Sequence, residues 1–590
     1  MNKLYALVLV FLPFVIAAQT SVKNIIIDAE TKKAIAYCNI FNRSTNNGVI
    51  SNAEGRFFIE IESLDDIISI SFIGYATRNI QAKRIINWNS VSLKKKQYQL
   101  KEVEIHSDND YLYDIMVDCR KALKKMNNKQ VSKSFFILNT SSNQQPLELL
   151  ECYYNARQTS GKLDDLYLKN GRFALQPSNN RFFLNHNTSQ VFNRLNFIKR
   201  SDILPDVILQ YGKNGMKKRF DVSLDYSNAD LYKISFWPKN NKTNSFHGEI
   251  WIDKHSSLIK KIHLNAQNIS KHPFIAFADD SIANVSLNTT YTFRQNDSIF
   301  AIEHIIFDMN FTYYSITGST LLSNKLPDLV REITISSVLF FYDFNNPFIL
   351  PYLEYDNLYT DYRKISIIPY NKNFWSSRKL LLTNEQKKQA EILNKEGVLV
   401  NYDTGNYGIN FMKDEFKSEK KYYKGFYEHP SYLFWSSTVR VVLKKDIIIK
   451  QSNQAYSYSG IPNDMYDFKV QILLDINSND SKFDCKSYTI FDLTKTFYWL
   501  KTNEYSNAFV NIYFDLCEIE RRKMENKLLK YNKSLRQIDS IYSNTLLNIE
   551  NVTHKYKKEV QRGNNVKDLK KWNDYVLDEL GIDNIKLFNN

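Results

Sequence analysis

The stretch from Glu504 to Gly563 contains neither glycine nor proline between its ends. Apolar residues recur there at spacings of three and four, which is typical of helices that pack against one another. One unbroken helix would measure about 90 Å at about 1.5 Å per residue, which is awkward in a compact domain. We therefore expect a break within 532–540, an antiparallel pair of helices, and a third helix over 565–580. A parallel coiled-coil dimer remains the alternative, because it would use the same residues. They are Leu528, Tyr531, Leu535, Ile538, Tyr542, Thr545, Ile549, Val552 and Tyr556.

The first of these helices contains Phe514-Asp515-Leu516-Cys517-Glu518 and then Arg522. This segment resembles the active-site helix of a family of secreted bacterial proteins that look like zinc proteases. The family's helix opens with His-Glu-x-x-His. Here the two histidine positions fall on Phe509 and Tyr513, and the glutamate position falls on Val510. The resemblance covers roughly 440–585 and extends to Gly460-Ile461-Pro462, the alternating run 468–472, Phe497-Tyr498-Trp499, 556–560, Gly563, Trp572 and Leu580.

These replacements remove the chemistry of a zinc site. Two histidines four residues apart share a helix face and can bind one Zn²⁺, while the glutamate polarises the bound water. Phe509 has no lone pair, the Tyr513 phenol is a poor ligand unless it is deprotonated, and Val510 cannot accept a proton. Glu518 cannot rebuild the site alone. The resemblance therefore implies a degenerate zinc site at these four positions, with no metal and no catalytic residue. The alternative is an ordinary core helix whose match to the family is accidental.

Residues 1–18 form a predicted secretory signal. Lys3 supplies a positive charge, Tyr5 to Ile16 are an apolar segment too short to span a bilayer, and Ala17-Ala18 precede a cleavage site at Gln19. The residue directly after the site is not a cysteine, so no lipoprotein anchor is expected, and no later apolar run is long enough for a transmembrane helix. We expect an exported chain in the periplasm or at the outer membrane or cell surface, with peripheral outer-membrane association left open.

Composition favours a multidomain, mainly β protein with an α+β carboxyl-terminal part. A length of 590 residues predicts three or four domains, and the 38 Tyr and 38 Phe favour strands. The five cysteines show no Cys-x-x-Cys spacing, so neither a disulfide framework nor a cysteine zinc site is indicated. The net charge of +15 would suit an anionic partner, but the lysines are spread along the whole chain. No nucleic-acid-binding motif is present, and we expect no nucleic-acid partner.

Residues 20–105 predict a small β-sandwich of Greek-key, transthyretin-like type. Short alternating runs such as Ile67-Ile68-Ser69-Ile70-Ser71-Phe72 are separated by turns, and Gly55 in the turn 52–55 is expected to take a positive φ. The segment resembles the carboxypeptidase-regulatory-like domain of Bacteroidetes envelope proteins, which is non-catalytic. The matching residues are 28–31, 35–36, 52–57, 70–75 and 100–103.

Residues 109–345 predict a β-rich middle domain that opens with an amphipathic helix over 109–128. The strands predicted within 230–236, 246–253 and 258–264 form an antiparallel series. This series resembles a domain of unknown function that often follows the same sandwich in Bacteroidetes proteins.

Residues 346–425 predict a connecting region. Its aromatic segments are expected to lie like a strap over a domain surface, and a short helix follows Thr383 as a plausible cap. The lysine-rich stretch 413–424 is expected to be a solvated linker. Residues 426–590 then hold the degenerate zinc-protease-like α+β domain.

Motifs of other enzyme classes are missing from the sequence. A zinc carboxypeptidase needs His-x-x-Glu, and none of the nine histidines has a glutamate three residues on. His255 and His263 are eight apart in predicted strands, so we interpret the histidines as solvated or core side chains. The sequence contains no phosphate-binding glycine motif, no Gly-x-Ser-x-Gly elbow and no EF-hand loop. We expect no cofactor.

Two functions follow from these observations. The preferred one is a non-catalytic exported cell-envelope protein with a binding or scaffold role, whose pseudo-protease domain binds a protein or peptide of the envelope in the old cleft. The alternative is a carboxypeptidase-like or other secreted hydrolase with a remodelled active site. Stoichiometric zinc that is lost together with activity on chelation would favour the hydrolase.

Overall fold

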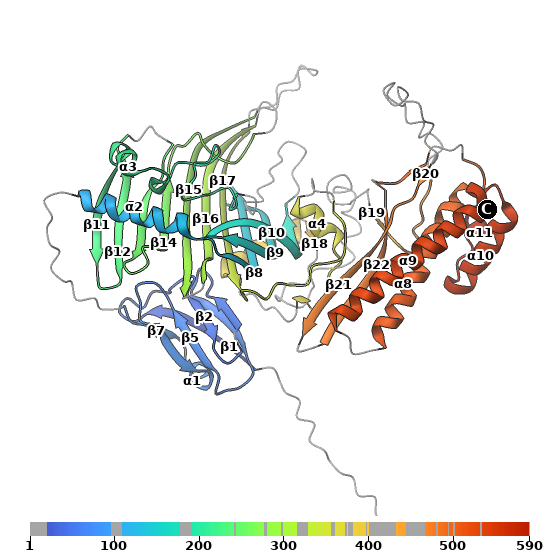
Figure 1. Cartoon of the computed structure of the whole chain (residues 1–590), viewed down its shortest axis with the longest axis horizontal. Helices are drawn as coiled ribbons and strands as arrows, with labels where there is room; N and C mark the ends of the chain where they lie inside the picture. The colour runs from blue at the N-terminus through green and yellow to red at the C-terminus, as the bar shows by residue number, and fades with distance from the viewer. Residues whose placement is uncertain are drawn as a thin grey trace, which may run out of the picture.

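The computed structural model contains a small sandwich, one large sheet, and a carboxyl-terminal sheet covered by helices (Figure 1). The predicted signal at 1–18 and the lysine-rich stretch 413–424 lie outside the described residues. The structure describes residues 20–588 without 46, 96–108, 177–190, 241–243, 277–279, 297–298, 316–328, 356–359, 372–373, 376–381, 397, 401–431, 444–465, 480–481, 494, 499–501 and 531–533.

Residues 20–95 form two small sheets around one apolar core, named here the amino-terminal sandwich. The strand orders are β4-β1-β7 and β3-β2-β5-β6. Gly55 has a φ of +73°, and a Cβ there would lie 2.7 Å from the Ile26 carbonyl oxygen, so the predicted turn requires glycine. The elements are β1 (Thr20–Asp28), β2 (Asn39–Asn42), β3 (Asn47–Ile50), β4 (Arg56–Ile61), β5 (Ile67–Ser71), β6 (Arg78–Gln81), α1 (Ala82–Ile86) and β7 (Val91–Leu93).

The described strands of the middle part form one large antiparallel sheet of 11 strands, in the order β11-β12-β13-β14-β15-β16-β17-β8-β9-β10-β18. The predicted strands within 230–264 are present as three consecutive neighbours in this sheet. The strands are β8 (Lys129–Ser142), β9 (Gln145–Thr159), β10 (Lys162–Leu175), β11 (Phe220–Ser227), β12 (Leu231–Pro238), β13 (His247–Asp253), β14 (Ile259–Ala266), β15 (Ser281–Asn296), β16 (Ile299–Ser315), β17 (Leu329–Tyr342) and β18 (Val398–Val400).

One face of the large sheet carries the main apolar core. The predicted amphipathic helix is present as α2 (Asp110–Lys125), which runs across several strands (Figure 1). Its Leu112, Met116 and Cys119 are fully buried in the same cluster as apolar side chains of β14, β15 and β16. Because side chains alternate along a strand, the residues between those apolar positions point to the opposite face. Helix α3 (Lys213–Arg219) and the turn η2 (Ile208–Gln210) lie next to α2.

The segment after β17 packs over β9 and β10, as the predicted strap would. Phe374 and Trp375 are buried against Tyr153. The Trp375 ring lies 4.2 Å from the Arg172 guanidinium carbon, and Arg172 makes a bidentate ion pair with Glu151 at 2.6 and 2.9 Å. The helices here are α4 (Asp361–Ile367) and α6 (Asn384–Glu396), and β18 from the same segment pairs with β10.

The carboxyl-terminal unit, residues 432–588, combines short sheets with helices on one side. The first long helix ends at Leu529, and the second begins at Leu535 after its cap Ser534, within the interval 532–540 predicted for the break. The two helices pack against each other: the Tyr556 hydroxyl of the second donates to the Phe509 carbonyl of the first at 2.9 Å. The elements are β19 (Tyr432–Phe434), β20 (Tyr466–Asp467), β21 (Val470–Asn479), β22 (Lys482–Asp492), β23 (Phe497–Tyr498), α8 (Ser506–Leu529), α9 (Leu535–Val560), η3 (Gln561–Gly563), α10 (Val566–Leu580) and α11 (Asn584–Phe588).

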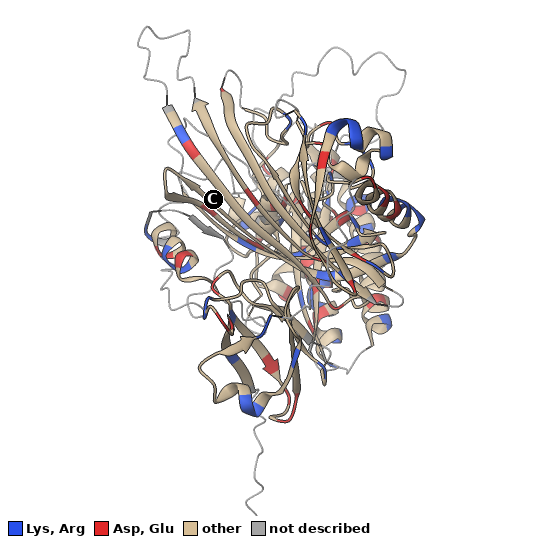
Figure 2. Ribbon diagram, turned by 90° about the vertical axis from the view of Figure 1, so that its left-hand side faces the viewer, with Lys and Arg blue, Asp and Glu red and all other residues tan. Residues whose placement is uncertain are grey.

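The expected fold class is therefore confirmed: mainly β, with a large antiparallel sheet and a helical carboxyl-terminal part. The domain boundaries proposed from the sequence stay a prediction. Basic and acidic residues are interspersed over the ribbon (Figure 2). Among the described helices, none is both long and apolar enough to cross a bilayer.

A buried ion pair joins the large sheet to the carboxyl-terminal unit. The Lys169 ammonium of β10 lies 2.5 Å from the Asp475 carboxylate of β21 and donates to the Ile476 carbonyl at 2.9 Å. Both side chains are almost fully excluded from solvent. Asn371 and Asn477 donate to the second carboxylate oxygen of Asp475 at 3.3 and 3.1 Å, so the strap also takes part in this junction.

We expect Lys169→Met to destabilise the junction by about 3–5 kcal/mol, because it leaves Asp475 buried without its cation. The double variant Lys169→Met/Asp475→Asn should recover much of that loss. Urea unfolding, with limited proteolysis of the carboxyl-terminal unit, measures the effect. Lys239→Met serves as the control, since its pair with Asp221 is exposed and should contribute less than about 1 kcal/mol. Equal losses for the two lysines would contradict the proposed importance of the pair.

Candidate functional site

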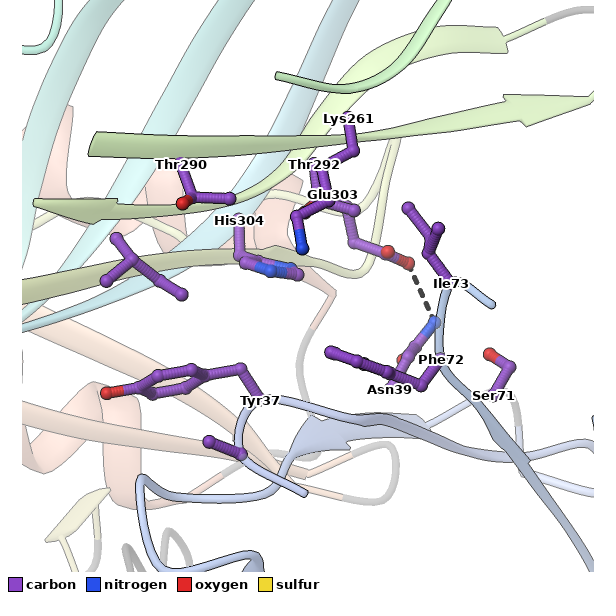
Figure 3. A pocket seen from close by; sticks show the side chains of 12 residues that line it. Tyr37, Asn39, Ser71, Phe72, Ile73, Lys261, Thr290, Thr292, Glu303 and His304 are labelled. Carbon is purple, nitrogen blue, oxygen red and sulfur yellow. Dashed lines mark hydrogen bonds between the residues drawn. The ribbon is translucent and has the colours of Figure 1, made fainter. Parts of the chain in front are cut away.

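A pocket of about 250 Å³ lies between the amino-terminal sandwich and the face of the large sheet opposite α2 (Figure 3). Both parts of the chain supply its walls, and the Asn39 amide donates to Glu303 Oε1 across it at 2.7 Å. The sandwich contributes Ala36, Tyr37, Asn39, Ser71, Phe72 and Ile73, and the sheet contributes Lys261, Thr290, Thr292, Glu303, His304 and Ile306.

Strand register places the polar residues of the sheet in one row. Lys261 of β14 stands opposite Thr292 of β15, and Thr292 stands opposite His304 of β16. Their sequence neighbours Ile262, Tyr291 and Ile305 point into the apolar core. The row therefore follows from the alternation of side chains along three adjacent strands.

A β-bulge explains why Glu303 and His304 both line the pocket although they are adjacent in sequence. Thr292 pairs with His304, whereas the next residue, Phe293, pairs with Ile302, so Glu303 is the extra residue in β16. Such a bulge leaves one residue unpaired in the ladder and turns its side chain. Without it, Glu303 would point towards the core.

Burial governs the charges at this interface. Desolvation raises the pKa of Glu303, while the nearby Arg294 guanidinium, 3.4 Å away, acts in the opposite direction. Desolvation, together with the Lys261 charge, lowers the pKa of His304 to about 3, so its ring is neutral at neutral pH. Desolvation also lowers the pKa of Lys261.

Two polar groups of the pocket, one on His304 and one on Lys261, lack the hydrogen-bond or ion-pair partner that buried polar groups usually have. Nδ1 of His304 finds no hydrogen-bond partner among the described residues, although the side chain is only 5% exposed. The Lys261 ammonium contacts the rings of Phe72 and Trp251, at 5.7 and 5.0 Å from their centroids, but forms no ion pair within the described part of the chain. Tyr37 lines the same pocket with a left-handed φ of 58°, which is uncommon for a residue other than glycine.

The positions predicted as a degenerate zinc site lie far from this pocket in the fold, on α8 of the carboxyl-terminal unit. Phe509 and Val510 are fully buried, and Tyr513 is 7% exposed. Phe509 and Tyr513 share a helix face and both contact the Phe468 ring. Val510 belongs to the same buried apolar cluster, so within the described residues these three positions are core residues. The expected peptide site at the old cleft stays a prediction. Whether the region descends from a zinc protease stays a prediction.

Two buried carboxylates of α8, Asp515 and Glu518, hold the carboxyl-terminal unit together. Glu518 accepts hydrogen bonds from Thr489, Arg521 and Arg522 at 2.7–2.9 Å. Asp515 accepts from Trp435, Arg440 and Asn584 at 2.5–2.7 Å. Among the described residues, no group of three or more His, Cys, Asp or Glu side chains is arranged to hold a metal ion.

Sequence reasoning did not find the pocket. His304 was interpreted only as one of several solvated or core histidines, and Lys261, Glu303 and Tyr37 were not singled out. The one available signal was the polar pair Glu303-His304 inside the otherwise apolar run 299–307. That signal indicates an interruption of the strand, but it does not show that the amino-terminal sandwich forms the other wall of a pocket there.

Comparison with known proteins supports the identity of the sandwich. Residues 25–105 match the CarboxypepD_reg-like domain, which confirms the resemblance stated for this part of the chain. The match covers a small fraction of the chain and leaves the rest unassigned. No curated protein matches the sequence.

Solved structures give only distant likenesses. A LolA superfamily protein from Nitrosomonas europaea is 12% identical, with 39% of this chain and 91% of that chain covered and a TM-score of 0.16. MucB is 7% identical, with coverage of 40% and 93% and a TM-score of 0.15. A DUF1329 family protein from Desulfovibrio piger is 11% identical, with coverage of 42% and 93% and a TM-score of 0.15. At these TM-scores the likenesses carry no argument about function.

We expect stability to fall in acid through Glu518. Burial raises the pKa of this carboxyl, but the hydrogen bond and charge of Arg521, with Thr489 and Arg522, outweigh it, so the pKa lies below its ordinary value of 4.5. A carboxylate with a depressed pKa stabilises the fold above the unfolded-state value, and this contribution is lost as the pH falls from about 4.5 through the folded-state pKa.

Unfolding free energies measured between pH 7 and pH 3 test this expectation. Glu518→Gln should have a lower free energy of unfolding at pH 7. Below pH 4.5 its free energy of unfolding should fall less steeply with pH than that of the unchanged protein. Glu550→Gln, at an exposed position of α9, should keep the slope of the unchanged protein. An unchanged slope in Glu518→Gln would show that other carboxyls cause the acid sensitivity.

Proposed function

We propose that the chain is an exported, non-catalytic binding protein of the cell envelope, and that its ligand site is the pocket between the sandwich and the large sheet. The observation that carries this proposal is the buried His304 ring, whose Nδ1 has no partner in a pocket formed by two parts of the chain. A polar group buried without a partner costs about 1–3 kcal/mol, and a ligand that supplies the missing partner removes this cost.

Other features fit a binding role. The sandwich matches a regulatory-like domain, and the positions at which the protease-like family has its ligands are occupied by Phe509, Val510 and Tyr513. The partner that we propose is a protein or peptide of the cell envelope, whose terminus would enter the pocket, or a small molecule of the envelope. We also propose that the protein associates peripherally with the outer membrane. The carboxyl-terminal unit would then act as a scaffold of pseudo-protease type.

Export is tested by the amino terminus of the mature protein. We expect cells to contain a processed chain that begins at Gln19 and fractionates with the envelope. Val8→Asp places a charge in the apolar segment of the signal and should leave the precursor unprocessed in the cytoplasm. An unchanged protein that keeps Met1 and stays cytoplasmic would overturn the proposed localisation.

Binding without catalysis is tested on protein purified from the envelope fraction. Native mass spectrometry should show a bound molecule in the unchanged protein and in Asn288→Tyr, but not in Thr290→Tyr. Both substitutions place a ring on the same face of β15, and Thr290 lines the pocket whereas Asn288 does not. Equal retention in the two variants would contradict the pocket as the site. Stoichiometric zinc whose removal abolishes a hydrolase activity would favour the hydrolase instead.

A further inference from the structure

The charges around the pocket leave one cation without a counter-charge. Glu303 interacts with Arg294, and Glu249, the nearest carboxylate on β13, is paired with Lys233 at 2.8 Å. Lys261 forms no ion pair within the described part of the chain. The His304 ring is neutral at neutral pH, so Lys261 is the one cation among the residues that line the pocket, and the lining carboxylate Glu303 is contacted by Arg294 and not by Lys261. A single negative charge on the ligand would balance the charge of Lys261.

The geometry also provides a second donor. The Lys261 side chain extends from β14 and the His304 ring from β16, the two strands on either side of β15, and both are directed towards the same space (Figure 3). A neutral imidazole can carry its one N–H on Nδ1, the atom that has no partner here. An ammonium and an imidazole N–H that flank β15 in one row and line the same pocket can each donate to one of the two oxygens of a carboxylate. A phosphate dianion fits less well, because it would bring a second negative charge next to Glu303.

The remaining walls favour an apolar substituent on that carboxylate. Tyr37 and Phe72 of the sandwich present aromatic rings to the pocket, and Ile73 adds aliphatic surface (Figure 3). Ile306 of the large sheet also lines the pocket. We propose that the pocket binds a carboxylate attached to a small apolar group, with Lys261 and His304 as the donors to its oxygens. The inference rests on the proposed binding role and names the chemical class of the ligand.

Such a ligand has two sources with the same chemistry: a small free carboxylic acid, or the carboxyl terminus of a polypeptide that ends in an apolar residue. Titration calorimetry on the mature chain, residues 19–590, distinguishes them. The probes are hexanoate, and an acetylated tetrapeptide ending in leucine with a free carboxylate. Hexanol, the amidated tetrapeptide and inorganic phosphate are the matched controls. We expect at least one carboxylate probe to bind and all three controls to bind at least tenfold more weakly.

Two variants test the donors. Lys261→Met keeps the aliphatic stem but removes the charge, and should weaken carboxylate binding about 10- to 100-fold. Lys260→Met is the control, because Lys260 is the preceding residue of β14 and is paired with Asp253 at 3.5 Å. His304→Phe should weaken binding as well, while the melting temperature of the ligand-free protein stays unchanged or rises, since the variant removes a buried polar group that has no partner.

These experiments distinguish a failure of the carboxylate assignment from a failure of the proposed binding role. Equal affinity for hexanoate and hexanol, full carboxylate affinity in Lys261→Met, or tighter binding of phosphate would overturn the carboxylate assignment. So would a failure of every carboxylate probe to bind. A molecule that co-purifies with the unchanged protein but not with Thr290→Tyr would still support a binding role if it proves to lack a carboxylate. A fall in the melting temperature of ligand-free His304→Phe would assign that ring a structural role.

Discussion

Backbone hydrogen bonds between β14, β15 and β16 determine which side chains meet the sandwich. Their register places Lys261, Thr292 and His304 in one row and directs the neighbouring apolar residues to α2. A slip of one residue would exchange the two faces and bury the charged row in the apolar core. The apolar core therefore determines where the polar row lies. Because the apolar face of these strands packs on α2, the alternating polar residues must point to the opposite side of the sheet, where the pocket is. The bulge at Glu303 interrupts this alternation at the pocket, and a second register shift in β14 leaves Lys260, directly before Lys261, without a partner in β13.

Two features that lower the stability of the fold occur at the pocket. His304 has a buried nitrogen without a partner, and Tyr37 has a left-handed backbone that costs on the order of 1 kcal/mol in a residue other than glycine. Other contacts also hold the sandwich in place: Asn39 donates to Glu303 of the large sheet, and Glu54 accepts a hydrogen bond from the Asn384 amide of α6 at 2.8 Å. Local costs that the fold does not require are more common at binding sites than elsewhere.

The sequence predicted those elements whose signal is local. The period of the apolar residues located α2, α8 and α9, alternation located the central strands, and Gly55 marked a turn that only glycine fits. The pair Glu303-His304 is the one local signal of the pocket and does not define it, because the residues of the two walls, 36–73 and 261–306, lie far apart in the chain. The Lys169–Asp475 junction is equally invisible, since an isolated lysine and an isolated aspartate are ordinary surface residues until the fold buries them together.

The carboxyl-terminal helix shows why a partial motif is weak support for a shared chemistry. Asp515 and Glu518, in the part that resembles the protease-like family, are buried carboxylates that fix α8 to residues far away in sequence. Any helix that packs against this sheet needs such contacts, whether or not a metal was ever bound beside it. Phe509, Val510 and Tyr513 stand where the metal chemistry would be, and they serve only the core. Asp515 and Glu518 therefore show how the helix is held in the fold, while Phe509, Val510 and Tyr513 lack the groups that a zinc site needs.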